Sequence, residues 1–122
     1  MITQYKNLIN GQMVSTVDVL DVVNPANEEI IGQVPSCGAA ELDQAVAAAR
    51  AAFPAWSKKP IAERRAVVQA ISATIKENLD ELFRLLTAEQ GKPHAQAQGE
   101  IMGASMMASA QSTLDLDDEI NE

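Results

Sequence analysis

The stretch that decides the fold spans residues 39–56 and reads AAELDQAVAAARAAFPAW. Four of its apolar residues recur three or four positions apart, which is the spacing of one helical face: Leu42, Val46, Ala49 and Phe53. Glu41 favours the start of a helix and Arg50 favours its end, because each complements the helix dipole at that position. We therefore predict a helix over residues 39–53.

Two further helices are expected directly after this one. Pro60 suits a first helical turn, and the chain then carries an apolar stripe at helical spacing, formed by Val68, Ile71 and Ile75 with Val67 at its edge. Asn78 can end this helix and cap the next one. The buried face of the third helix would consist of Leu79, Leu82, Phe83 and Leu86. Gly91 is expected to end it.

A fourth helix is predicted from Pro93 to about Leu114. Its packed face would consist of Ala97, Ile101, Ala104 and Ala108, with Met102, Met106 and Met107 nearby. The acidic run at 115–122 opposes the negative end of a helix dipole, so we expect a solvated tail there.

The residues before position 37 predict β-structure. Asn10 and Gly11 supply the positive backbone angles of a type I′ turn, which predicts a small hairpin. A second extended pair, residues 18–23 and 29–34, is separated by a turn that contains Pro25. The expected fold class is a mostly helical α+β fragment, with β-hairpins over 1–36 and about four helices over 37–114.

Composition excludes several functional classes. The length predicts one compact unit, and the formal net charge of −8 argues against nucleic-acid binding, which needs clustered Lys and Arg. Cys37 and His94 are the only residues of their types, so a disulfide within the chain is excluded and a Cys/His zinc site lacks ligands. Neither a leader sequence nor a membrane-length apolar run is present, which predicts a cytoplasmic location without a membrane partner.

No catalytic constellation emerges from the residues themselves. Cys37 lacks a nearby base, and His94 lacks a nucleophile or an orienting carboxylate in its local sequence. The sequence Gly91-Lys92-Pro93 lacks the glycine spacing and hydroxyl residue of a phosphate loop, so a helix end followed by a restart explains it better. We therefore predict no catalytic and no cofactor-binding residue in this chain.

Several motifs, taken in order, resemble the aldehyde dehydrogenase superfamily. LING at 8–11 and VNPANEEII at 23–31 are similar to its opening, and AVAAARAAFPAW at 45–56 is similar to its first long helix. Glu63-Arg64, EQGKP at 89–93 and GEI at 99–101 follow in the family's order. The resemblance covers nearly the whole chain.

This resemblance implies that residues 1–122 form the N-terminal part of a cofactor-binding domain. The complete enzyme would oxidise an aldehyde to a carboxylic acid with NAD or NADP, through a Cys nucleophile and a Glu-activated water. The family's catalytic and cofactor motifs lie in later segments, and Cys37 does not match the nucleophile. We therefore expect the isolated chain to be inactive, to bind no cofactor alone, to need the remainder of the dehydrogenase as its partner and to form homo-oligomers.

One site is implied by the resemblance alone. Family members hold a monovalent cation with backbone carbonyls before the NP motif and with a carboxylate before the GKP motif. The matching positions here are Val22, Val23 and Glu89, where relatives often have Asp in place of Glu89. An exposed Glu89 near a helix end is the competing interpretation. A competing interpretation of the whole chain is a stand-alone helical module that binds a partner protein through its Ala-rich and Met-bearing faces.

Overall fold

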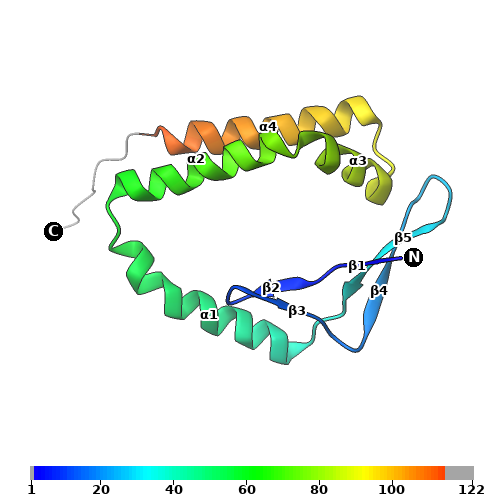
Figure 1. The fold of residues 1–122 in the computed structure, drawn as a ribbon, viewed down its shortest axis with the longest axis horizontal. Helices are drawn as coiled ribbons and strands as arrows, with labels where there is room; N and C mark the ends of the chain where they lie inside the picture. Colours follow the sequence, from blue (N-terminus) through cyan, green and yellow to red (C-terminus); the bar gives the residue numbers. More distant parts are fainter. Residues whose placement is uncertain (1, 115–122) are drawn as a thin grey trace. The chain divides into compact units, whose positions relative to one another are not determined.

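The computed structural model describes residues 2–114, and the acidic tail predicted at 115–122 lies outside the described residues. Short strands come first and long helices follow (Figure 1). The described elements are β1 (Thr3–Gln4), β2 (Asn7–Ile9), β3 (Gln12–Val14), β4 (Val19–Val23), β5 (Ile30–Pro35), α1 (Ala39–Ser57), α2 (Ile61–Glu77), α3 (Leu79–Gln90) and α4 (His94–Ser112). The predicted mostly helical α+β fold, with strands followed by four helices, is confirmed.

The chain divides into two compact units, and the division falls inside α3. The first unit comprises Met1–Lys59 and Leu85–Pro93, which include all of the described strands, α1 and the last part of α3. The second comprises Pro60–Arg84 and His94–Glu122, which include α2, the first part of α3 and α4. The length predicted one compact unit, and this prediction is wrong because the chain forms two.

The first unit contains both predicted hairpins. Strands β2 and β3 pair antiparallel, and the two residues between them, Asn10 and Gly11, have φ angles of 50° and 73° as a type I′ turn requires. Strands β4 and β5 also pair antiparallel. Strand β1 was not predicted: it adds to β5 in parallel, and the larger sheet has the order β1-β5-β4.

The long helix of the first unit extends further than predicted. We expected an end at Phe53, but α1 continues through Pro54 to Ser57. Proline removes one backbone hydrogen bond inside a helix, and near the end of an exposed helix water can satisfy the carbonyl that is left over. The Ser57 hydroxyl also donates to the Pro54 carbonyl at 3.2 Å, which helps to hold the last turn.

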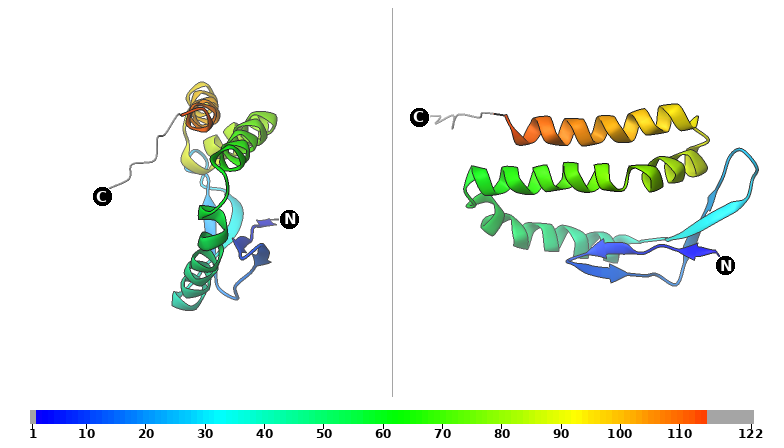
Figure 2. Two further views of the ribbon diagram at one scale, coloured as in Figure 1. Left: turned by 90° about the vertical axis from the view of Figure 1, so that its left-hand side faces the viewer. Right: turned by 45° about the horizontal axis from the view of Figure 1, so that its top comes forward.

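In the second unit, α2 and α4 lie side by side, as Figures 1 and 2 both show. Their contact is made by hydroxyl groups that the apolar pattern did not predict. Ser72 donates to the Ser105 carbonyl at 2.8 Å, and Ser105 donates to the Ser72 carbonyl at 2.9 Å. Both serines are buried, whereas Ile71 is half exposed. The face predicted for α4 was wrong at Ala104, which is exposed, and right at Ala97, which is fully buried.

Helix α3 begins and ends where predicted, although Asn78 plays a different role. Its side-chain amide donates to the Thr74 carbonyl at 2.8 Å, so this hydrogen bond lies at the end of α2 and not at the start of α3. Gly91 ends α3 with a φ of 71° and donates its N–H to the Thr87 carbonyl at 2.8 Å. A Cβ at Gly91 would lie 2.9 Å from Cγ of Pro25, so glycine is required for both conformation and space.

Burial is shallow in the part of the chain that the structure describes. There, the buried hydrophobic core consists of Phe83 and Ala97. The apolar stripe of α1 is largely uncovered, because Leu42, Val46 and Phe53 are 63%, 43% and 65% exposed. None of the described helices is both long and apolar enough to cross a membrane.

Candidate functional site

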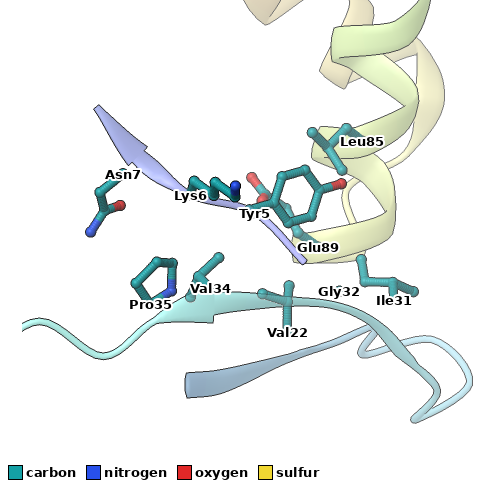
Figure 3. Close-up of a pocket in the computed structure, with 10 residues that line it drawn as sticks. All are labelled: Tyr5, Lys6, Asn7, Val22, Ile31, Gly32, Val34, Pro35, Leu85 and Glu89. Atoms are coloured by element: carbon teal, nitrogen blue, oxygen red, sulfur yellow. The ribbon is translucent and has the colours of Figure 1, made fainter. Parts of the chain in front are cut away.

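The predicted cation site coincides in part with a cavity of about 240 Å³ in the first unit (Figure 3). Val22 of β4 and Glu89 of α3 both line this cavity. Its other lining residues are Tyr5, Lys6, Asn7, Ile31, Gly32, Val34, Pro35 and Leu85. Val23 does not line it. The structure therefore brings two of the three predicted residues together.

A glycine and an aromatic ring shape one wall of this cavity. The Tyr5 N–H donates to the Gln33 carbonyl at 2.8 Å, which continues the pairing of β1 with β5. The Tyr5 ring lies over Gly32, where a Cβ would come within 2.7 Å of the ring atom Cε2. Gly32 therefore leaves room for an edge of the tyrosine ring, and a side chain at this position would displace the ring.

The irregular backbone beside the cavity suits cation binding better than a regular strand does. The register of β4 against β5 shifts between Val22 and Val23, and such bulges take backbone groups out of the regular ladder. Glu89 lies in the last turn of α3, where the helix dipole favours positive charge. Carboxylate and carbonyl oxygens are the ligands that hard cations prefer.

Two features of the cavity oppose a tight cation cage. Glu89 is exposed, so water competes for its carboxylate, and Lys6 contributes a positive charge to the same lining. Among the described residues there is also no cluster of three His, Cys, Asp or Glu that could hold a metal ion. Any cation here would therefore depend mainly on backbone oxygens together with Glu89. Tyr5 and Lys6 were missed by sequence reasoning, since β1 is only two residues long.

Cys37 and His94, which the sequence argued against as nucleophile and general base, lie in ordinary environments. Cys37 is exposed, and the Asn7 amide donates to its sulfur at 2.9 Å. An amide donor cannot accept a thiol proton, so this contact does not activate the cysteine as a base would. His94, in the other unit, packs edge-on against Phe83, with ring centroids 5.6 Å apart. Its contact is that of a packing residue.

The second unit contains a groove of about 470 Å³ along α2 and α4. Hydroxyl and amide groups line it beside exposed methionines: Gln69, Ser72, Ser105, Ser109, Met102 and Met106. These hydroxyls are engaged with one another and with Gln69, since the Ser72 and Ser105 hydroxyls are hydrogen-bonded at 3.2 Å and Ser109 donates to Gln69 Oε1 at 3.4 Å. These bonds join the two helices, and they give the groove a structural role.

The residues present do not fit a dinucleotide cofactor. Such sites use a glycine-rich turn between a parallel strand and a helix, with the pattern G-x-G-x-x-G. The six glycines of the chain stand at positions 11, 32, 38, 91, 99 and 103, and no group of them has that spacing. Strand β5, which precedes α1, pairs antiparallel with β4.

Comparison with known proteins identifies the source of the ordered motifs. Residues 13–120 match the model of the aldehyde dehydrogenase family. A probable aldehyde dehydrogenase of a Pseudomonas species is 41% identical over 114 residues, which are 93% of this chain and 23% of that protein. The rat mitochondrial methylmalonate-semialdehyde/malonate-semialdehyde dehydrogenase is 43% identical over 98 residues, which are 79% of this chain and 18% of that protein.

Solved structures agree with this match. Lactaldehyde dehydrogenase from Escherichia coli superposes with a TM-score of 0.89 at 32% identity, over 92% of this chain and 24% of that one. An NAD-dependent aldehyde dehydrogenase from Sinorhizobium meliloti gives a TM-score of 0.87 at 32% identity, over 92% and 23%. The chain thus spans about a quarter of the length of these relatives. Because the family match extends over most of its residues, this chain belongs to the aldehyde dehydrogenase family.

Proposed function

We propose that this chain is the N-terminal segment of an NAD(P)-dependent aldehyde dehydrogenase that oxidises an aldehyde to a carboxylic acid. The observation that carries the proposal is the continuous family match over residues 13–120 in a chain that covers 23% of its Pseudomonas relative. The segment supplies β-hairpins and outer helices to a cofactor domain. It contributes no catalytic residue, and alone it is inactive.

The cofactor of the complete enzyme is NAD or NADP. Relatives of both kinds support this, since one solved relative is described as NAD-dependent and another, from Escherichia coli, as NADP-dependent. The glycine pattern of this chain supplies no dinucleotide turn, so the cofactor would bind to segments beyond those present here.

The exposed stripe of α1 supports a requirement for the remainder of the enzyme. Leu42, Val46 and Phe53 fall on one helical face and remain between 43% and 65% exposed. Covering one large aliphatic or aromatic side chain is worth about 1.5–3 kcal/mol, so this face gains substantially from a partner. The partner we propose is the rest of the dehydrogenase polypeptide, within an enzyme that forms homo-oligomers.

A complementation assay tests this function. The purified chain with an aldehyde and NAD or NADP should give no reduced cofactor above background, because both chemistry and cofactor binding need absent residues. Co-expression with the Pseudomonas relative that lacks its matching N-terminal segment should restore cofactor reduction.

Two substitutions sharpen the assay. Phe53→Asp should abolish complementation, because it places a charge on the α1 stripe, whereas Val17→Asp should not, because Val17 is fully exposed outside the stripe. Cofactor reduction by the chain alone would contradict the proposal. Failure to complement, together with tight binding of an unrelated protein through the same face, would instead favour the stand-alone interaction module.

A further inference from the structure

The turn of the β2–β3 hairpin exposes an asparagine whose side chain is not held in place. Asn10 and Gly11 are both exposed, and a Cβ built on Gly11 would meet nothing within 4 Å. Over the described residues, Asn10 is the one asparagine whose side-chain amide has no hydrogen-bond partner. The others bond as follows: Asn7 to Cys37, Asn24 to Ala26, Asn27 to Glu29 and Asn78 to Thr74.

We propose that Asn10 is a site of spontaneous deamidation and isomerisation, independent of the function proposed above. The Gly11 backbone nitrogen loses its proton to hydroxide and attacks Cγ of Asn10. A C–N bond closes a succinimide ring while the bond to the side-chain nitrogen breaks; that nitrogen takes a proton from water, which regenerates hydroxide, and leaves as ammonia. Water then opens the ring at one of its two carbonyls and leaves an aspartyl or isoaspartyl residue. Water is consumed and ammonia released, so no oxidant is needed.

Glycine at position 11 makes this attack accessible. A side chain on the following residue crowds the approach of its nitrogen to Cγ, and Gly11 has none. Asn7 and Asn78 are each followed by leucine, and Asn27 by glutamate. Asn24 is followed by Pro25, whose nitrogen carries no hydrogen and cannot close the ring. Sequence neighbour and hydrogen bonding therefore single out the same asparagine.

The hairpin can open far enough for the reaction. The Gly11 nitrogen reaches Cγ of Asn10 by rotation about the Cα–C bond of Asn10, and the paired strands on either side restrict that rotation, so ring closure requires the turn to relax first. Strands β2 and β3 are three residues each and form a separate two-stranded sheet, and Leu8 and Met13 are 70% and 62% exposed. Two-stranded hairpins are marginally stable, and the bond from Asn7 to Cys37 holds the end of the hairpin away from the turn, so local opening of the turn costs little.

The modification would alter the surface beside the hairpin. An isoaspartyl residue adds a main-chain carbon to a turn that has only two residues between paired strands, and either product adds a negative charge. Asn7, Leu8 and Ile9 of β2 line an open hollow of about 630 Å³ beside the start of α1. A rearranged turn therefore changes the wall of this hollow.

Peptide mapping of the full chain after incubation at mildly alkaline pH tests the proposal. The peptide containing residue 10 should gain the mass that separates an amide from an acid and should become a substrate for isoaspartyl methyltransferase. Asn10 should convert at least about tenfold faster than Asn27, a barrier difference of about 1.4 kcal/mol. Asn27 is the matched internal control, since it is also an exposed turn residue.

Two variants test whether the mass gain comes from Asn10. Asn10→Asp should remove ammonia release from this peptide. Gly11→Ala should slow conversion even though it loosens the turn, because the added methyl hinders the attacking nitrogen. A synthetic peptide of residues 7–14 should convert no more than about tenfold faster than the folded chain, because opening costs little. Retention of the Asn10 amide while this peptide converts, or conversion of Asn27 at an equal rate, would overturn the proposal.

Discussion

Among the described residues, two glycines have a positive φ, Gly11 and Gly91. Replacing Gly91 by alanine should destabilise the first unit more than replacing Gly11 does. Gly91 has a φ of 71°, a conformation that costs a residue with a Cβ about 1–2 kcal/mol. The new Cβ would also lie 2.9 Å from Cγ of Pro25, and forcing a methyl into a packed contact costs about 1–3 kcal/mol. The expected loss is therefore about 2–5 kcal/mol, a large share of a small domain's stability.

Gly11→Ala is the matched control for conformation alone. Gly11 has a φ of 73°, but its added Cβ would meet nothing within 4 Å. Its substitution should cost only about 1–2 kcal/mol. The difference between the two losses in free energy of unfolding therefore measures the cost of the contact with Pro25.

Urea unfolding followed by far-ultraviolet circular dichroism, at one fixed protein concentration, measures both free energies of unfolding. Pro25→Ala in the Gly91→Ala background should recover part of the loss, because it removes the Cγ atom that the new methyl meets. If Gly91→Ala costs no more than Gly11→Ala, or if Pro25→Ala recovers nothing, the reasoning is refuted.

Three further outcomes follow from the described contacts. Gly99→Ala and Gly103→Ala should each raise the free energy of unfolding by about 0.5–1 kcal/mol, because both lie in α4 with open space at the Cβ; a loss of stability in thermal scans would disprove this. Ser72→Ala and Ser105→Ala should each lower the free energy of unfolding by about 1 kcal/mol, and the double variant should cost less than their sum, because the two hydroxyls also share a hydrogen bond at 3.2 Å that either substitution removes; additive losses in a double-mutant cycle would contradict it. At the proposed cation site, K⁺ should raise the thermal midpoint of the parent chain and of Glu77→Gln but not of Glu89→Gln, and rubidium soaks should give an anomalous peak near Glu89. A parent chain with the same midpoint in the presence and absence of K⁺ would contradict the site.

Features that depend on nearby residues could be predicted from the sequence. The Asn10–Gly11 turn needs only two adjacent residues with positive φ, and Gly91 ends α3 for a similar local reason. The four helices follow from apolar periodicity within each segment. Local patterns therefore suffice for the four helices and for the two hairpins that precede them.

Features that depend on a distant partner could not be predicted. Ser72 and Ser105 are buried because each satisfies the other, and nothing near either serine indicates that pairing. Strand β1 is two residues long and exists because β5 is there to pair with it. Pro54 lies inside α1 although proline usually ends a helix. The helix continues because the hydrogen bond that proline removes belongs to the exposed last turns.

The candidate site also combines residues that could be proposed from the sequence with residues that could not. Its residues Val22 and Glu89 were proposed together only through the family resemblance, since nothing in their local sequences connects them. The structure brings both into one cavity, and it adds Tyr5 and Lys6, which no motif had indicated. The balance between a cation-binding carboxylate and a neighbouring lysine can be weighed only in three dimensions.

Sedimentation equilibrium of the isolated chain tests most directly whether its helix faces require another surface. The α1 stripe is exposed, Val67 and Ile71 of α2 are 46% and 50% exposed, and few apolar side chains in the described range are buried. The account predicts concentration-dependent self-association of the folded chain at micromolar concentration. A stable monomer that unfolds cooperatively would contradict it, because these faces would then need no partner.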